Sequence, residues 1–260
     1  MVGLGAMGRP IAEHIARAGF RTLAFDLSPD ARADGVTVVG SLAGLAPADV
    51  VIVIVPTDED VIGVVAGPDG IFHHGKPGLT VVISASVRPA TCRELAAEGE
   101  RRQIRVIDAA LTGGVRGAEN GEINLLVGGP RETADAISDV FAAFARHYHV
   151  LGGVGAGQIG KSANNLIHWA EIAAIDESMR LAADLGVDPA ELRAALQHGP
   201  ADSRTLREIE QMRFTWYAKD IDVAEELAAG VGRDLPVARL SRERMSRITV
   251  ASVHQLLGIP

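Results

Sequence analysis

The residues best suited to chemistry stand just past the middle of the chain, where a glycine-rich segment leads into a long helical pattern. That segment reads Gly155-Ala156-Gly157-Gln158-Ile159-Gly160-Lys161-Ser162-Ala163-Asn164-Asn165. Lys161, Asn165 and His168 follow the spacing i, i+4, i+7, which places them on one face of a helix. A lysine is electrostatically misplaced in the first turns of a helix, where the macrodipole is positive. The placement indicates that the ammonium group serves chemistry.

Proton transfer is the chemistry that this lysine suggests. A helix N-terminus and partial burial both lower the pKa of a lysine, which brings a proton-accepting neutral amine within reach, and the ammonium donates in the reverse direction. Asn165 can orient a reacting oxygen without changing the charge. The simple alternative is a solvated lysine at a helix start, because exposed lysines are the rule. The neighbouring glycines and the asparagine pair favour the chemical interpretation, whereas His168, next to Trp169, is better explained as a packed helix residue.

A second motif lies at the N-terminus, where Gly3, Gly5 and Gly8 form the pattern G-x-G-x-x-G. A helical pattern over 9–18 and a strand over 21–25 that ends at Asp26 follow it. In this context the glycines let the backbone approach a pyrophosphate at a helix N-terminus, and the acid holds the ribose hydroxyls. The predicted cofactor-binding residues here are Gly3, Leu4, Gly5, Ala6, Met7, Gly8 and Asp26.

The same segment favours NAD over NADP. The negative charge of Asp26 would repel a 2′-phosphate, and the next residues, 27–29, contain no arginine, Arg32 being the nearest. Only Met1 and Val2 precede the motif, whereas a first strand normally has about five residues. Either the chain begins late or its start is misassigned, and a central strand this short is expected to expose the core.

The first half alternates strands and helices, which predicts a doubly wound parallel sheet. Strands are expected at 36–39, 49–55, 80–83, 105–109, 124–129 and 147–151, and helices at 41–45 (capped by Ser41), 58–65, 89–102 and 133–144. After the glycines at 152–153 only helices are expected, at 157–185, 190–197, 205–212, 220–230 and 236–248. The predicted fold is an α/β Rossmann-type doubly wound parallel sheet plus an all-α C-terminal domain. Residues 1–153 form the dinucleotide-binding domain, and residues 154–260 form a helical substrate and oligomerisation domain that begins with a long interdomain helix.

A pair of glycines follows the strand at 105–109. Adjacent glycines at Gly113 and Gly114 expose backbone N–H groups, which form a nest suited to an anion such as a carboxylate. A plain flexible loop over 111–121 explains the spacing equally well.

Composition excludes several classes of function. A net charge of −8 and a pI near 5.5 argue against the basic face that nucleic acids need. No apolar run approaches the roughly 20 residues of a membrane span, and no signal-peptide pattern is present. Cys92 is the single cysteine, so no internal disulfide forms and the cytoplasm is the expected compartment. Lying inside a helix without an evident base, it is expected to be inert.

No metal site is expected from the clustered titratable side chains. His147 and His149 lie at i, i+2 without acids or cysteine beside them, so an exposed strand end is the better interpretation. Glu171, Asp176 and Glu177 are spread around a helix, and we expect them to form surface or interdomain salt bridges.

Four stretches together resemble the β-hydroxyacid dehydrogenase family, typified by 3-hydroxyisobutyrate dehydrogenase and tartronate semialdehyde reductase. They are Gly3–Gly8 with Pro10, Asp108–Gly121, Gly155–Asn165 and Lys219-Asp220-Ile221. Their order and spacing match over essentially the whole chain. The resemblance implies a Rossmann-type N-terminal domain, a 6-phosphogluconate dehydrogenase-like helical C-terminal domain and an active site in the cleft between them.

The resemblance also implies roles for single residues. Lys161 matches the catalytic lysine and Asn165 its hydrogen-bonding partner to the substrate, beside Asn164. Lys219 matches a lysine that closes on cofactor and substrate, while Asp220 is expected to cap the helix that starts there. Thr112, Gly113 and Gly114 match the substrate-binding Ser-Gly-Gly, Ser86 falls near the nicotinamide, and Val55, Pro56 and Thr57 match a cofactor-lining strand end.

The chain departs from the family pattern at three places. Thr112 replaces the usual serine and Ala110 the usual proline, so the substrate loop is expected to sit differently. The aromatic segment 213–217 argues against a very small hydroxy acid.

The activity implied is hydride transfer between a β-hydroxy acid similar to 3-hydroxyisobutyrate and NAD, with the lysine as general acid and base. Alternatives are an NADPH-dependent semialdehyde or imine reductase and a non-catalytic cofactor-binding member, against which the Lys161–Asn165 pair argues. The expected partners are a small carboxylate-bearing substrate and further copies of the chain. A homodimer or homotetramer is expected through the helical domain, where small residues recur over 170–183. Neither nucleic acid nor membrane is expected to bind.

Overall fold

The computed structural model describes residues 1–259, and it forms two compact units. The first unit ends at Lys161 and the second begins at Ser162, so the division falls within one long helix, α8 (Ala156–Asp184). Each unit has a hydrophobic core of its own.

The first unit is built on a sheet whose strands are mostly parallel. Its five-stranded part has the order β3-β4-β5-β6-β7, and each neighbouring pair is parallel except β5–β6, which is antiparallel. A parallel pair, β1–β2, forms a separate two-stranded part. The strands are β1 (Leu23–Ala24), β2 (Thr37–Val38), β3 (Val50–Val53), β4 (Thr80–Ile83), β5 (Arg105–Thr112), β6 (Ile123–Gly128) and β7 (Ala145–Gly152).

The two parts of the sheet are joined by the first residues of the chain. Val2 forms parallel bridges to Phe25, just after β1, and to Val53 in β3. Its backbone N–H donates to Ile52 (2.8 Å), and its carbonyl accepts from Ile54 (2.9 Å). The expectation that so short a strand exposes the core is wrong here, because Met1 and Val2 are only 7% and 2% exposed.

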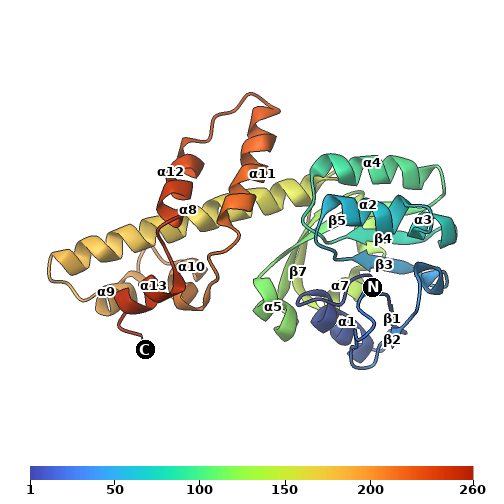
Figure 1. The fold of residues 1–260 in the computed structure, drawn as a ribbon, viewed down its shortest axis with the longest axis horizontal. Coiled ribbons are helices and arrows are strands. Elements are labelled where there is room, and N and C mark those ends of the chain that lie inside the picture. The colour runs from blue at the N-terminus through green and yellow to red at the C-terminus, as the bar shows by residue number, and fades with distance from the viewer. Residues whose placement is uncertain (260) are drawn as a thin grey trace. The chain divides into compact units, whose positions relative to one another are not determined.

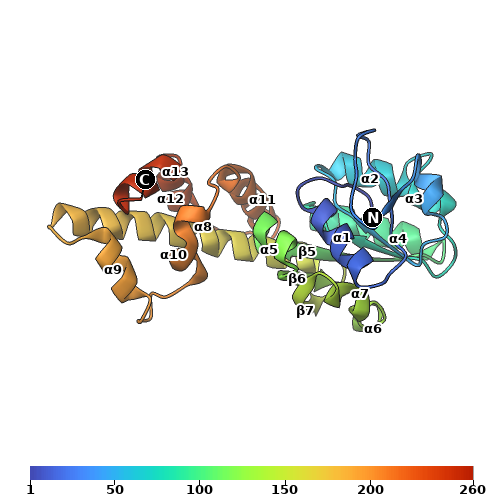
Figure 2. The ribbon, with the colours of Figure 1, turned by 90° about the horizontal axis from the view of Figure 1, so that it is seen from below.

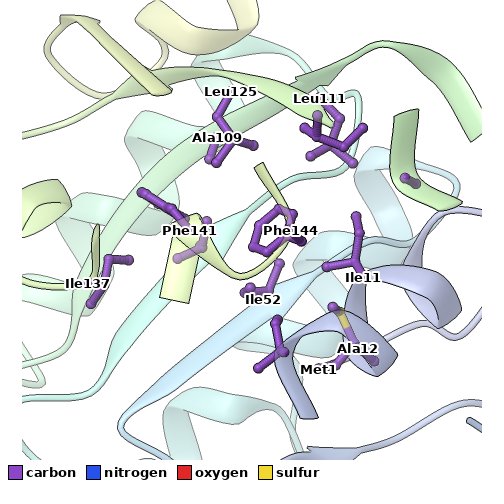
Figure 3. Packing of buried hydrophobic residues seen from close by; sticks show 14 of the residues in the cluster. Met1, Ile11, Ala12, Ile52, Ala109, Leu111, Leu125, Ile137, Phe141 and Phe144 are labelled. Carbon is purple, nitrogen blue, oxygen red and sulfur yellow. The ribbon is translucent and has the colours of Figure 1, made fainter. Parts of the chain in front are cut away.

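Helices cover both faces of this sheet, as Figure 1 shows. α1 (Gly8–Arg17) and α7 (Ser138–Ala142) pack on one face, where Ile11, Phe141 and Phe144 meet strand residues such as Ile52 (Figure 3). α2 (Asp58–Ala66), α3 (Ile71–His74) and α4 (Pro89–Glu100) pack on the other. Successive side chains of β4 point to opposite faces of the sheet. Val82 packs in the cluster with α1 and α7, whereas its neighbours Val81 and Ile83 pack in the cluster with α2, α3 and α4. Buried on both faces, such a strand must be apolar throughout.

The second unit is all-helical. It consists of the later part of α8 with α9 (Pro189–Leu196), α10 (Arg204–Glu208), α11 (Tyr217–Ala229), α12 (Pro236–Met245) and α13 (Val250–Leu256), which Figure 2 shows from a second side. Its core gathers Trp169 and Ile172 of α8 with Ile221, Met245 and Val253. α8 ends where Gly186 adopts φ = 84°, and Asp188 caps α9 by accepting hydrogen bonds from the N–H groups of residues 190 and 191.

The predicted fold class, a Rossmann-type α/β sheet followed by a helical domain, is confirmed. Three local predictions are wrong: the single helices at 133–144 and 205–212 and the cap at Ser41. The segment 133–144 holds two short helices, α6 (Arg131–Asp135) and α7, and 205–212 holds α10 followed by the 3-10 helix η2 (Ile209–Gln211). Of the two interpretations left open for 111–121, the flexible loop is excluded, because β5 continues to Thr112 and α5 (Gly114–Asn120) follows. Ser41 precedes the 3-10 helix η1 (Leu42–Leu45) without a capping bond from its side chain to any described residue. Within residues 1–259, no helix is both long and apolar enough to cross a bilayer.

Candidate active site

A tight glycine turn leads from Val2 into α1. Gly3 has φ = 91°, and a Cβ atom there would lie 2.0 Å from the Ile54 carbonyl oxygen. A Cβ atom at Gly8 would lie 2.0 Å from the Gly3 oxygen, so both positions require glycine. At Gly5 a Cβ atom would have no described atom within 4 Å, so the backbone is open there. Open backbone beside a helix N-terminus fits a pyrophosphate, and the turn therefore fits the predicted dinucleotide.

Asp26 is held in place just after β1. Its Oδ2 accepts from the Leu4 N–H (2.6 Å) and its Oδ1 from the Ser28 N–H (2.8 Å). Each carboxylate oxygen keeps a lone pair for a further donor, such as a ribose hydroxyl. An open depression of ≈ 680 Å³ lies beside it, lined by Phe25, Asp26, Leu27, Ser28, Pro29, Arg32, Val36, Val38, Val39 and Gly40.

The guanidinium of Arg32, which also lines the depression, donates to the carbonyls of Pro29 (2.9 Å) and Ala31 (2.7 Å).

The predicted cofactor-lining residues Val55, Pro56 and Thr57 follow β3. Val55 is half-buried, whereas Pro56 and Thr57 are exposed. The Thr57 hydroxyl accepts from the Asp60 N–H (3.1 Å) and caps α2.

Lys161 lies in the second turn of α8 and is half-buried. Its Nζ donates to the Leu111 carbonyl oxygen at 2.8 Å. This bond places the amine at the C-terminal end of β5, beside the predicted substrate residues that start at Thr112. The C-terminal ends of strands are where ligands bind in open α/β sheets.

The predicted substrate residues form a strand-to-helix turn. The Thr112 hydroxyl donates to the Asn124 carbonyl oxygen (3.0 Å) and accepts from the Asn124 side-chain amide (3.2 Å). Gly113 and Gly114 have φ values of 109° and 63°, and a Cβ atom at Gly114 would meet no described atom within 4 Å. The backbone N–H groups at this turn are therefore open to a small anion, as the nest interpretation predicts.

Ser86 lies in the segment after β4, where it is exposed between the buried Ala85 and Val87. The side chain of Gln158, in the first turn of α8, holds this segment from both sides of Ser86. Its Nε2 donates to the Ala85 carbonyl (2.9 Å), and its Oε1 accepts from the Val87 N–H (3.3 Å).

In the second unit, the remaining predicted residues lie on α8 and α11. Asn165, one helical turn after Lys161, is half-buried and accepts from the exposed Asn164 side chain (3.1 Å). Lys219 is exposed on α11. The next residue, Asp220, accepts from the Trp169 indole N–H at 3.0 Å.

Comparison with known proteins identifies the family of the chain. Residues 1–153 match the family model for the NAD binding domain of 6-phosphogluconate dehydrogenase. Residues 155–255 match the model for the NAD-binding domain of NADP-dependent 3-hydroxyisobutyrate dehydrogenase. The chain belongs to the β-hydroxyacid dehydrogenase family.

Characterised members of the β-hydroxyacid dehydrogenase family resemble the chain over most of its length. The mitochondrial 3-hydroxyisobutyrate dehydrogenase of Homo sapiens is 33% identical over 72% of this chain, and the probable enzyme of Dictyostelium discoideum is 32% identical over 74%. The matched parts span 57% and 61% of those two relatives. The 2-hydroxy-3-oxopropionate reductase of Escherichia coli is 28% identical over 90% of this chain and 85% of its own length. The structure of Mycobacterium tuberculosis 3-hydroxyisobutyrate dehydrogenase with L-serine superposes with a TM-score of 0.85 at 25% identity, covering 98% of this chain and 97% of that one.

The sequence-based prediction gave no role to two buried residues at the start of α8 and in β5, Gln158 and Asp108. Asp108 is fully buried in β5, where its carboxylate accepts from the N–H groups of Gly155 (2.5 Å) and Gln158 (3.0 Å). Gln158 is 5% exposed. A charged residue in the middle of an apolar strand was the available signal for Asp108.

One prediction about acids is wrong. Asp220 does not cap α11, because that helix begins at Tyr217 and the carboxylate binds the Trp169 indole. The predicted salt bridges of Asp176 and Glu177 are present, with Arg244 3.6 Å from Glu177, but Asp176 is buried rather than at the surface. Its side chain is 3% exposed and accepts a bidentate bond from Arg180, and Arg244 of α12 lies 3.9 Å away.

Two other side chains, His168 and Cys92, behave as the sequence suggests. His168 Nδ1 lies 3.1 Å from the Thr205 hydroxyl, and its ring packs against Trp169, so it is a packed helix residue. Cys92 is a free, buried cysteine, and burial raises the pKa of its thiol well above the ordinary value. Among residues 1–259, His, Cys, Asp and Glu side chains form no group of three that could hold a metal ion.

Proposed function

We propose that this chain is an oxidoreductase that transfers hydride between a small β-hydroxy acid, similar to 3-hydroxyisobutyrate, and NAD. Lys161 is the general acid and base of the reaction. The observation that carries the proposal is the position of Lys161 Nζ, which lies 2.8 Å from the Leu111 carbonyl oxygen. Leu111 directly precedes Thr112–Gly114 in the sequence.

The residues around Lys161 have separate roles when the substrate is oxidised. The N–H groups at Gly113 and Gly114 bind the substrate carboxylate, since the turn is open and both residues have positive φ. Lys161 Nζ takes the proton of the substrate hydroxyl, and in the reductive direction it returns a proton to the carbonyl oxygen. The Leu111 carbonyl holds the amine in place by accepting one of its N–H bonds.

The glycine turn and Asp26 fit a nicotinamide dinucleotide, which accepts the hydride when bound. We infer NAD because the Asp26 carboxylate is fixed by two backbone amides with lone pairs left for ribose hydroxyls, and because its charge disfavours a 2′-phosphate. Ser86, Val55, Pro56 and Thr57 are inferred to line the cofactor, as in the family.

The remaining assignments follow from membership of the family. Residues 1–153 would bind the dinucleotide, and residues 154–260 would serve the substrate and oligomerisation. Asn165 would hydrogen-bond the substrate, with Asn164 and Lys219 as further binding residues. We infer a homodimer or homotetramer through the helical domain, supported by exposed apolar side chains on α8 and α12 such as Leu181 (60%) and Leu240 (65%). The cytoplasmic location stays a prediction.

Reduction of a semialdehyde is the second candidate, favoured by the similarity to the Escherichia coli 2-hydroxy-3-oxopropionate reductase. It requires the same groups, since Lys161 then donates the proton that it takes up in oxidation. The two candidates differ in substrate and direction rather than in site.

A substrate screen tests the proposal. The purified chain is assayed with NAD and with NADP against 3-hydroxyisobutyrate, 3-hydroxypropionate and L-serine, and in reverse with NADH or NADPH against 2-hydroxy-3-oxopropionate, following the absorbance of the reduced cofactor. Turnover of a β-hydroxy acid with NAD supports the proposal, and preference for the semialdehyde with NADPH supports the alternative. Cofactor binding without turnover of any of these compounds would instead indicate a non-catalytic member.

A further inference from the structure

A fully buried carboxylate lies where β5 meets the start of α8. Asp108 is 0% exposed, and it stands between the apolar residues Ile107 and Ala109. Burial of a carboxylate is costly unless hydrogen bonds compensate for lost water. Here the compensation comes from the N–H groups of Gly155, just before α8, and of Gln158, in its first turn. The carboxylate is therefore tied to that helical turn.

Glycines make room for this contact. A Cβ atom at Gly128 would lie 2.4 Å from Asp108 Oδ1, and one at Gly157 would lie 2.7 Å from Asp108 Oδ2 and 2.2 Å from the Leu126 carbonyl oxygen. The first turn of α8 thus packs backbone to backbone on β6, and any added atom would displace it.

A second tether acts on the same turn. Gln158 binds the segment after β4 through the Ala85 carbonyl and the Val87 N–H. The start of α8 is consequently attached to two neighbouring strands, to the middle of β5 through Asp108 and to the segment after β4 through Gln158. Two attachments that lie on different strands fix both the register and the rotation of a helix.

Lys161 depends on this geometry. It follows Gln158 by three residues on the helix, and Leu111, its hydrogen-bond acceptor, follows Asp108 by three residues on the strand. We propose that Asp108, together with Gln158, is a positioning residue that sets α8 so that Lys161 Nζ lies at the end of β5. The inference rests on the proposed function for its catalytic consequence, whereas the anchoring itself does not.

Asp108→Asn tests the proposal with little change of shape. The amide offers one acceptor oxygen, while its NH₂ group faces an N–H donor, so at least one amide of the first turn loses its partner. Hydrogen exchange of the peptide covering residues 153–161 should rise by about tenfold or more. Acetylation of Lys161 by acetic anhydride, measured relative to Lys76, should rise as the bond to Leu111 is lost.

The catalytic readouts use NAD and 3-hydroxyisobutyrate with deuterium or hydrogen at the reacting carbon. Per folded molecule, kcat should fall by on the order of 10²-fold, because misplacement of a catalytic group by about 1 Å has that effect. The Kd of NAD should change by less than about twofold, and the primary isotope effect on kcat should rise as the chemical step becomes rate-limiting.

The control is a core variant far from α8, Phe141→Leu or Phe141→Ala, chosen to match the drop in melting temperature. A general loss of stability leaves kcat per folded molecule and the isotope effect unchanged. The proposal is overturned if exchange and Lys161 labelling in Asp108→Asn equal those of wild type, or if its kcat equals that of the control. If Asp108→Asn does not fold, Gly157→Ala carries the same test. A wild type that oxidises no hydroxy acid refutes the proposed function alone, since exchange and labelling still decide the anchor.

Discussion

If the site prefers NAD, as we propose, replacement of Asp26 by asparagine should weaken NAD binding and reduce the selectivity against NADP. The carboxylate is fixed by the Leu4 and Ser28 amides and borders the ≈ 680 Å³ depression beside the glycine turn. Asparagine keeps the shape but removes the charge and one of the two acceptor oxygens.

The size of the effect follows from these contacts. A hydrogen bond to a charged group contributes about 1.5–3 kcal/mol, so loss of one ribose hydroxyl bond weakens NAD binding by about 2 kcal/mol, roughly 30-fold. A 2′-phosphate about 5 Å from the carboxylate is repelled by about 1.5 kcal/mol in water, taking its charge as nearly −2. Removal of that repulsion improves NADP binding, so the ratio of the two Kd values should change by on the order of 10²-fold.

Titration of the intrinsic fluorescence with each cofactor measures both Kd values. Asp30→Asn is the matched control, because it removes the same charge from an exposed residue that does not line the depression. Melting temperatures of both variants check that Leu4 and Ser28 remain ordered. An unchanged ratio in Asp26→Asn, or an equal change in Asp30→Asn, would refute the reasoning.

Three further predictions concern stability and reactivity. Trp169→Phe removes the indole donor to Asp220, so urea unfolding should show a loss of about 2 kcal/mol, and a loss below about 0.5 kcal/mol would show that the bond contributes little. Cys92 is buried with a raised thiol pKa, so iodoacetamide near pH 8 should label it only in urea, as mass spectrometry reports, and rapid labelling of the folded chain would contradict its burial. Burial raises the pKa of Asp108, so the folded state holds its proton more tightly than the unfolded chain. The free energy of unfolding therefore falls as pH rises from the unfolded pKa through the folded pKa, and wild type should lose stability relative to Asp108→Asn as pH rises above about 4, the ordinary pKa of an aspartate. A difference independent of pH would contradict that shift.

Much of the fold could be predicted because its determinants are local. Apolar runs such as 81–83 mark strands buried on both faces, and the glycines at 3, 5 and 8 mark the turn into α1. The candidate site residues were predicted from motif and spacing, and the structure places Lys161 Nζ against Leu111, next to Thr112 at the end of β5.

The parts that could not be predicted depend on contacts distant in sequence. The antiparallel β5–β6 pair has no marker in either strand, since both strands are mostly apolar and mostly buried, as parallel strands also are. Met1 and Val2 are buried because β3 and the end of β1 pair with them, which no window of sequence shows. Asp108 gains its role from amides 47 and 50 residues away. Its charge marked it as unusual, but only the fold identifies its partners.

The central claim is that Lys161 transfers the proton. Turnover of the best hydroxy acid with NAD should fall on the order of 10²–10⁴-fold in Lys161→Ala, while the Kd of NAD stays near that of wild type. Lys76→Ala is the control, since that lysine pairs with Asp49 on the surface. Turnover by Lys161→Ala close to that of Lys76→Ala, with every hydroxy acid tried, would contradict the account.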